Sequence, residues 1–154
     1  MIHLNIIVIG KLKENYWREA EQEYLKRLSP WTKISLEEIK EEAFDEKSNK
    51  TIIKNKEGEE IIKKIKTGLT FILDEHGDSF TSLELAEKLE HLADQTSTIN
   101  FIIGGPLGLS DALLKKYPKI SFSKMTFPHQ MMRIFLLEQL YRSFMINSNK
   151  KYHY

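Results

Sequence analysis

The 154-residue chain contains no cysteine, which excludes disulfide bonds, thiolate metal sites and cysteine nucleophiles. No apolar run approaches the roughly 20 residues that a helix needs to span a bilayer. The first residues, Met1 to Ile6, lack the basic start and the small-residue cleavage site of a secretory signal. These absences predict a cytoplasmic protein without a membrane partner.

Fingerprints of several enzyme and ligand classes are missing as well. The chain contains neither G-x-G-x-x-G nor G-x-x-x-x-G-K-[ST], which weighs against the alternative of a flavodoxin-like nucleotide-binding protein. It also has no nucleophile elbow and no H-E-x-x-H. The five histidines are scattered without ligand spacing, so we predict no metal site.

The net charge of +1 conceals an uneven distribution of charged residues. Residues 112–154 contain eight Lys and Arg and one acid, Glu138, so this part carries +7 and the preceding residues carry −6. A basic segment of this kind is typical of a protein with a polyanionic partner. The alternative is a set of solvated lysines, which we favour for Lys115, Lys116 and Lys119 taken alone.

Short apolar runs alternate with helical patterns along the chain. The apolar runs predict strands at 2–9, 34–39, 69–73, 98–103 and 120–122, and the helical spacing predicts helices near 14–28, 48–65, 81–93, 110–116 and 129–147. We expect a turn at 74–78, after the third strand. The alternation predicts a single α/β domain over residues 1–154, with a mostly parallel sheet flanked by helices.

The predicted last helix is apolar around almost its whole circumference. Such a helix must be buried on several sides, and a second subunit would supply the missing cover. The alternative is a helix that lies at the centre of its own core. Glu138 and Arg142 are four residues apart on this helix, so part of the charge of Arg142 is expected to be paired.

Three loops are expected to meet at one edge of the sheet. They follow Leu73, begin at Gly104-Gly105, and run from Phe122 to Pro128. Ligands of open parallel sheets bind outside the carboxyl ends of the strands, although a glycine loop alone is more often a structural turn. His129 begins the last helix beside the third loop and is the best candidate for a functional histidine; a helix cap is the alternative.

Several stretches of the chain resemble one known family: Gly10–Lys13, Lys56–Glu59, Ile102–Gly108, Ser121–Arg133, Glu138–Arg142 and Tyr152-His153. These residues resemble the bacterial 23S ribosomal RNA (pseudouridine-N3)-methyltransferases of the SPOUT, or α/β-knot, superfamily. The resemblance covers essentially the whole chain and implies a C-terminal trefoil knot. It also implies S-adenosyl-L-methionine as methyl donor, S-adenosyl-L-homocysteine as product, no metal, and a homodimer acting on 23S rRNA within the ribosome.

The resemblance also implies roles for individual residues. The cofactor-binding residues would be Leu73, Gly104, Gly105, Phe122, Ser123, Lys124, Met125, Thr126 and Phe127. The RNA-binding residues would be Lys124, Arg133, Arg142 and Tyr152, and the catalytic residues would be His129, Arg142 and His153. Two alternatives stay open, namely a methyltransferase of the same superfamily that acts on another RNA such as tRNA, and a non-catalytic module that binds RNA or the ribosome.

Overall fold

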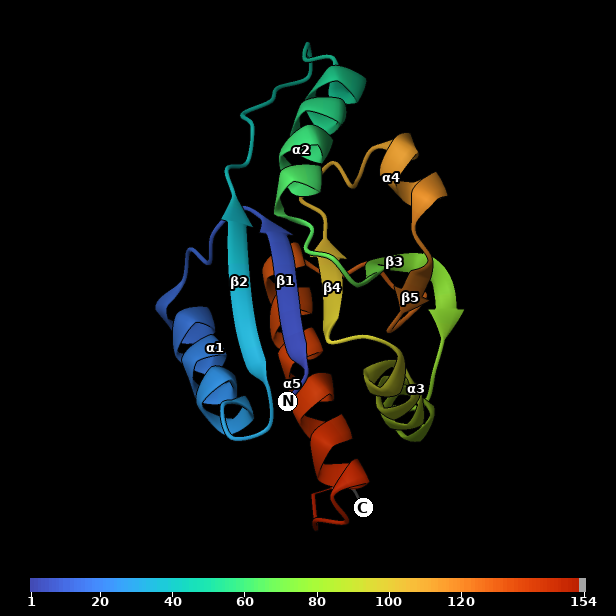
Figure 1. Cartoon of the computed structure of the whole chain (residues 1–154). Coiled ribbons are helices and arrows are strands. Elements are labelled where there is room, and N and C mark those ends of the chain that lie inside the picture. The colour runs from blue at the N-terminus through green and yellow to red at the C-terminus, as the bar shows by residue number, and fades with distance from the viewer. Residues whose placement is uncertain (153–154) are drawn as a thin grey trace.

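The computed structural model describes residues 1–152 as a five-stranded parallel sheet flanked by helices, in the strand order β2-β1-β4-β3-β5 (Figure 1). The strands are β1 (His3–Ile9), β2 (Lys33–Ile39), β3 (Leu69–Ser79), β4 (Thr98–Ile103) and β5 (Lys119–Ser121). The helices are α1 (Asn15–Leu28), α2 (Lys50–Lys64), α3 (Ser82–Gln95), α4 (Asp111–Lys116) and α5 (His129–Asn147). The predicted α/β class and parallel sheet are confirmed, whereas the knot stays a prediction.

Both faces of the sheet are covered, which explains why β1 and β4 are continuous apolar runs rather than alternating ones. On one face, Ile6, Phe101 and Leu137 belong to a core built with side chains of α1, α3 and α5. On the other face, Ile7 of β1 and Ile61 of α2 belong to a second core, to which α4 also contributes. Helix α5 crosses behind β1 and runs against the strand direction (Figure 1), so it begins at the carboxyl edge of the sheet.

Strand β3 differs from the prediction, because it continues through residues 74–78 to Ser79 instead of ending in a turn at Leu73. It pairs with β5 in two registers, since Ile120 is opposite Leu73 in the first and opposite Asp78 in the second. The Asp and Gly content of this segment favours a turn, but pairing with a distant strand outweighs that local preference. A Cβ atom on Gly77 would lie 2.5 Å from the carbonyl carbon of Lys119, so β5 approaches too closely for any other residue.

Within residues 1–152, no helix is long and apolar enough to cross a membrane.

Candidate active site

A cavity of about 650 Å³ lies where residues 73–75 of β3 and the connections after β4 and β5 meet the start of α5. Its walls are Leu73, Asp74, Glu75, Ile103, Gly104, Gly105, Pro106, Leu107, Gly108, Leu109, Phe122, Ser123, Met125, Thr126, Phe127, Pro128, His129 and Met132. The volume is within the range of small-molecule sites. Two of the three expected loops, after β4 and β5, therefore meet at one edge, and the third wall comes from residues 73–75, which belong to β3 instead of a loop.

The loop after β4 follows a tight course that depends on its glycines. The backbone N–H of Gly108 donates to the carbonyl of Gly105 at 3.0 Å, and Gly108 has a left-handed φ of 78°. A Cβ atom would lie 2.8 Å from Cγ2 of Ile9 at Gly105, and 3.0 Å from Cγ of Leu109 at Gly104. The glycines thus let the loop pack on β1 while their backbone atoms form one wall of the cavity.

The opposite wall, the loop after β5, is fastened to the extended part of β3. The hydroxyl of Ser121 is 2.9 Å from the carbonyl oxygen of Ser123 and 3.2 Å from that of Glu75. The hydroxyl of Thr126 donates to a carboxylate oxygen of Glu75 at 2.5 Å, and the N–H of Met125 donates to the hydroxyl of Ser123 at 3.0 Å. The extension of β3 therefore holds the hydroxyl-rich loop in place.

The cavity combines apolar surface with two carboxylates. Leu73, Phe127 and the highly exposed Met125 supply apolar surface, while Asp74 and Glu75 come from the segment that was expected to be a turn. Two adjacent carboxylates give this wall a negative potential, which suits a cationic ligand. Sequence reasoning missed both acids; the signal available was their position directly after a buried strand.

His129 begins α5 and lines the cavity, but it does not cap the helix, since Pro128 is the N-cap residue and no side chain caps this end. Its Nε2 atom is buried and has no hydrogen-bond partner within residues 1–152. Burial lowers the pKa of His129 below its ordinary value of 6.5, with the charge of Glu41 opposing the shift and that of Lys13 adding to it. The imidazole is therefore neutral at neutral pH and able to accept a proton.

Arg133 does not face solvent, contrary to its predicted contact with an RNA phosphate. The residue is 3% exposed, and its guanidinium pairs with Glu21 of α1 and, at 2.8 Å, with Glu38 of β2. It would have to break both ion pairs to reach a phosphate. These contacts assign Arg133 to the packing of α5 against α1 and β2, and its contact with RNA stays a prediction.

Arg142 and Tyr152 lie about 20 Å farther along α5 than His129, at 1.5 Å of rise per residue. The ring of Tyr152 packs against the ring of Tyr141 with centroids 4.9 Å apart, and the Arg142 guanidinium lies 4.8 Å from its centre. Arg142 also donates to Glu138 at 2.7 Å, as its spacing predicted. Burial, together with a hydrogen bond to Tyr24, raises the pKa of Tyr152 to about 12.

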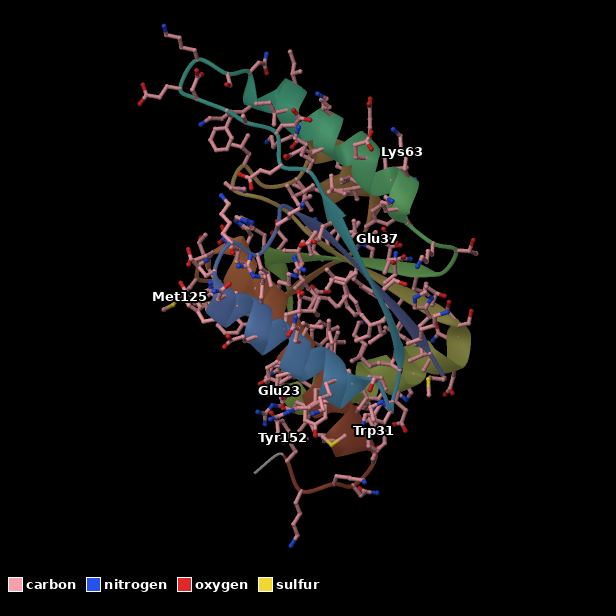
Figure 2. The ribbon with its side chains drawn as sticks, turned by 90° about the vertical axis from the view of Figure 1, so that its left-hand side faces the viewer. Glu23, Trp31, Glu37, Lys63, Met125 and Tyr152 are labelled. Atoms are coloured by element: carbon pink, nitrogen blue, oxygen red, sulfur yellow. The ribbon has the colours of Figure 1, made fainter. Side chains whose placement is uncertain are left out.

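Within one chain, the predicted site residues therefore separate into two groups. All the predicted cofactor residues except Lys124, which is exposed on the same loop, line the cavity with His129. Figure 2 shows the second group at the other end of α5, where Tyr152 lies near Glu23, whereas Met125 lies near the start of that helix. His153 lies outside the described residues.

The family-level comparison agrees with this geometry. Residues 2–153 match the family model described as "Predicted SPOUT methyltransferase". The chain belongs to the SPOUT methyltransferase family. Its relatives in that family include proteins named ribosomal RNA large subunit methyltransferase H from Caldicellulosiruptor saccharolyticus and Alkaliphilus oremlandii. They are 45% and 46% identical, over 97% and 99% of this chain, and 99% of each relative is covered.

A solved structure supports the SPOUT fold at low sequence identity. A probable methylase family protein from Haemophilus influenzae Rd KW20 superimposes with a TM-score of 0.50 at 13% identity. The match covers 96% of this chain and 67% of the other. At that identity it bears on the fold alone.

The chemistry of the cavity suits the methyl donor that a SPOUT methyltransferase uses, which is typically S-adenosyl-L-methionine. Glycine backbone and hydroxyl groups suit an adenosyl group, apolar side chains suit the adenine ring, and two carboxylates suit a positive sulfonium. Within residues 1–152, no three His, Asp or Glu side chains are grouped so as to hold a metal ion.

Proposed function

We propose that this enzyme transfers a methyl group from S-adenosyl-L-methionine to N3 of a pseudouridine in 23S rRNA, on assembled ribosomes in the cytoplasm. The name shared by its relatives supports ribosomal RNA as the substrate. The observation that carries the catalytic part is the cavity itself, which joins the glycine loop, the hydroxyl-rich loop and a half-buried neutral histidine. A non-catalytic RNA-binding module would have no need to combine these three features in one cavity.

The donor supplies an electrophilic methyl group on a sulfonium, so the protein has to bind the donor, orient its methyl group and exclude water from it. We assign adenosyl binding to the backbone at Gly104 and Gly105 and to the loop from Phe122 to Phe127. Leu73, Met125 and Phe127 exclude water from the ring, and the carboxylates of Asp74 and Glu75 favour the positive charge. Lys124, exposed at the rim, is placed to contact an RNA phosphate rather than the donor.

The acceptor nitrogen has to lose a proton, and His129 is the group in the cavity that can take it. Its lowered pKa keeps the imidazole neutral, and its buried Nε2 has no hydrogen-bond partner within residues 1–152. Acid–base assistance of this kind contributes on the order of 10²–10⁴-fold to a rate.

The separation of the two residue groups favours a homodimer with a composite site. Arg142 and Tyr152 lie about 20 Å along α5 from His129, so the tail of one chain is far from its own cavity. A second copy could bring its Arg142, Tyr152 and the adjoining His153 to that cavity. The exposed Phe135 on α5, which contacts Phe127 of the cavity wall, lies where such a copy would pack.

The test uses ribosomes from cells that lack this gene, mixed with the purified enzyme and the methyl donor. Mass spectrometry of the digested 23S rRNA should show one new methylpseudouridine, and a parallel reaction with tRNA should show none. Methyl transfer to tRNA alone would mean that the substrate is tRNA and not 23S rRNA. Donor binding without methyl transfer to either RNA would refute the proposed reaction. If calorimetry detected no binding of the donor, the non-catalytic module would be favoured.

A further inference from the structure

A second cleft, of about 880 Å³, opens beside the donor cavity at the same edge of the sheet. Two segments form it, namely residues 10–13 and Arg18, which follow β1, and residues 38–43 at the end of β2. His129 and Gln130 of α5 lie between the cleft and the donor cavity, since they contact a small gap shared with Gly10, Lys11 and Leu12. The cleft is thus a neighbouring surface rather than part of the donor cavity.

The cleft carries an excess of positive charge. Lys11, Lys13 and Lys40 are exposed and have no ion pair within residues 1–152. Two of its three carboxylates are partly compensated, because Glu42 pairs with Lys56 at 3.2 Å and Glu38 shares Arg133 with Glu21.

The remaining carboxylate, Glu41, lies toward the inner end of the cleft. A Cβ atom on Gly10 would be 3.0 Å from the Glu41 Oε2 atom and 3.6 Å from Nε2 of His129. Arg18 also lines the cleft, so its four cations outnumber its three carboxylates, two of which have an ion pair. The outer part of the cleft therefore suits a polyanion.

The loop that carries two of these lysines is held by hydrogen bonds on three sides. The N–H of Gly10 donates to the carbonyl of Ile39 at 2.7 Å, and Arg18 donates to the carbonyl of Leu12 at 2.9 Å. The N–H of Lys13 donates to Oε1 of Gln130 at 2.8 Å, which fixes the loop to the start of α5. The lysines are therefore presented from a fixed backbone beside His129.

We propose that this cleft binds the phosphate backbone of the RNA strand that flanks the target nucleotide, with Lys11, Lys13 and Lys40 as the phosphate contacts. The inference rests on the proposed function, because the strand has to leave the cleft toward the donor cavity past His129. It extends the RNA-binding surface into residues 1–111, which carry a net negative charge, whereas the charge distribution alone pointed to residues 112–154. Phosphate contacts of this kind position the RNA and do not select its sequence.

The test compares two triple variants that lose the same charge. The first is Lys11→Ala, Lys13→Ala, Lys40→Ala; the control is Lys26→Ala, Lys33→Ala, Lys63→Ala, in which Lys26 lies in the last turn of α1 and Lys33 begins β2, at the opposite edge of the sheet. Binding to purified ribosomes is measured at several salt concentrations, beside donor affinity by calorimetry. We expect the first variant to bind ribosomes about tenfold or more weakly, with a salt slope smaller by about 2, since each single-strand phosphate contact contributes about 0.7.

Donor affinity should be unchanged in both variants, which shows that the fold is intact, and the control should bind ribosomes like the wild type. The inference is overturned if the first variant binds ribosomes with the affinity and salt slope of the wild type, whether that binding is tight or weak. The proposed function fails separately, if the wild type transfers no methyl group while its ribosome binding still depends on the three lysines.

Discussion

Replacing Arg133 with Met should destabilise the protein strongly, although the substitution lies outside the donor cavity. Removing one partner of a buried ion pair costs about 3–5 kcal/mol, because the other charge stays desolvated. Here the side chains of Glu21 and Glu38 are 14% and 33% exposed, so water can partly solvate them after the substitution. We therefore expect a loss of about 2–3 kcal/mol in the free energy of unfolding.

The measurement is urea unfolding followed by tryptophan fluorescence, since Trp17 lies on α1 and Trp31 lies between α1 and β2. A loss of that size corresponds to about 5–10 °C in the melting temperature of a domain this long. Adding Glu21→Gln and Glu38→Gln to the Met variant should restore part of the stability, because the unpaired charges are then removed.

Lys63→Met is the matched control. Lys63 pairs with Glu60 at the surface, with side chains 66% and 50% exposed, and such an exposed pair contributes little to stability. If Arg133→Met left the unfolding midpoint within the range of this control but weakened ribosome binding, the structural role would be wrong and the predicted RNA contact would be right.

Three further predictions concern the site and its surroundings. Gly77→Ala should force β5 away, because its Cβ would lie 2.5 Å from the carbonyl carbon of Lys119, and should cost about 1–3 kcal/mol and weaken donor binding in calorimetry. The methylation rate should fall as pH drops below 6.5 through the lowered pKa of His129, and His129→Gln should lose this dependence together with most of the rate. Glu57→Gln should raise the thermal midpoint at pH 7 but not near pH 4, because burial raises the pKa of Glu57 above 4.5 and its charged form is costly in the folded state; glutamine still accepts from the N–H of Glu42.

Each of these has a result that would count against it. Gly77→Ala with the donor affinity of Ser79→Ala, an exposed neighbour, would show that β5 tolerates the extra atom. A full rate in His129→Gln would remove the histidine from the proposed proton transfer. A midpoint for Glu57→Gln that is lower at pH 7 than at pH 4, relative to the wild type, would mean that the carboxylate is stabilised rather than strained by its surroundings.

The sequence predicted the elements whose apolar pattern is strong and local. Strands β1 and β4 and helix α5 have nearly the expected bounds, and the meeting of the loops after β4 and β5 followed from the parallel arrangement of the strands. The end of β3 was wrong because its turn-like residues pair with β5, which lies far away in the sequence.

The role of Arg133 was beyond local reasoning for a similar reason. Its ion-pair partners lie 112 and 95 residues earlier in the chain, so nothing near it in the sequence indicates that it is buried. The cleft after β1 and β2 was not predicted, because charge was summed over segments of the sequence. The excess of positive charge in the cleft depends on which carboxylates form ion pairs in the folded chain. The distance of Arg142 from His129 already followed from the predicted helix, because thirteen residues rise about 20 Å, whereas the packing of Tyr152 beside Arg142 needed the structure.

The order in which the cavity walls occur in the chain has a consequence for biosynthesis. Leu73 and the glycine loop leave the translating ribosome before the hydroxyl-rich loop and His129. Helix α5 also supplies Leu136, Leu137 and Leu140 to one core. A nascent chain that stops before α5 should thus capture no methyl donor, and competence for donor binding would arise only after this helix has been synthesised.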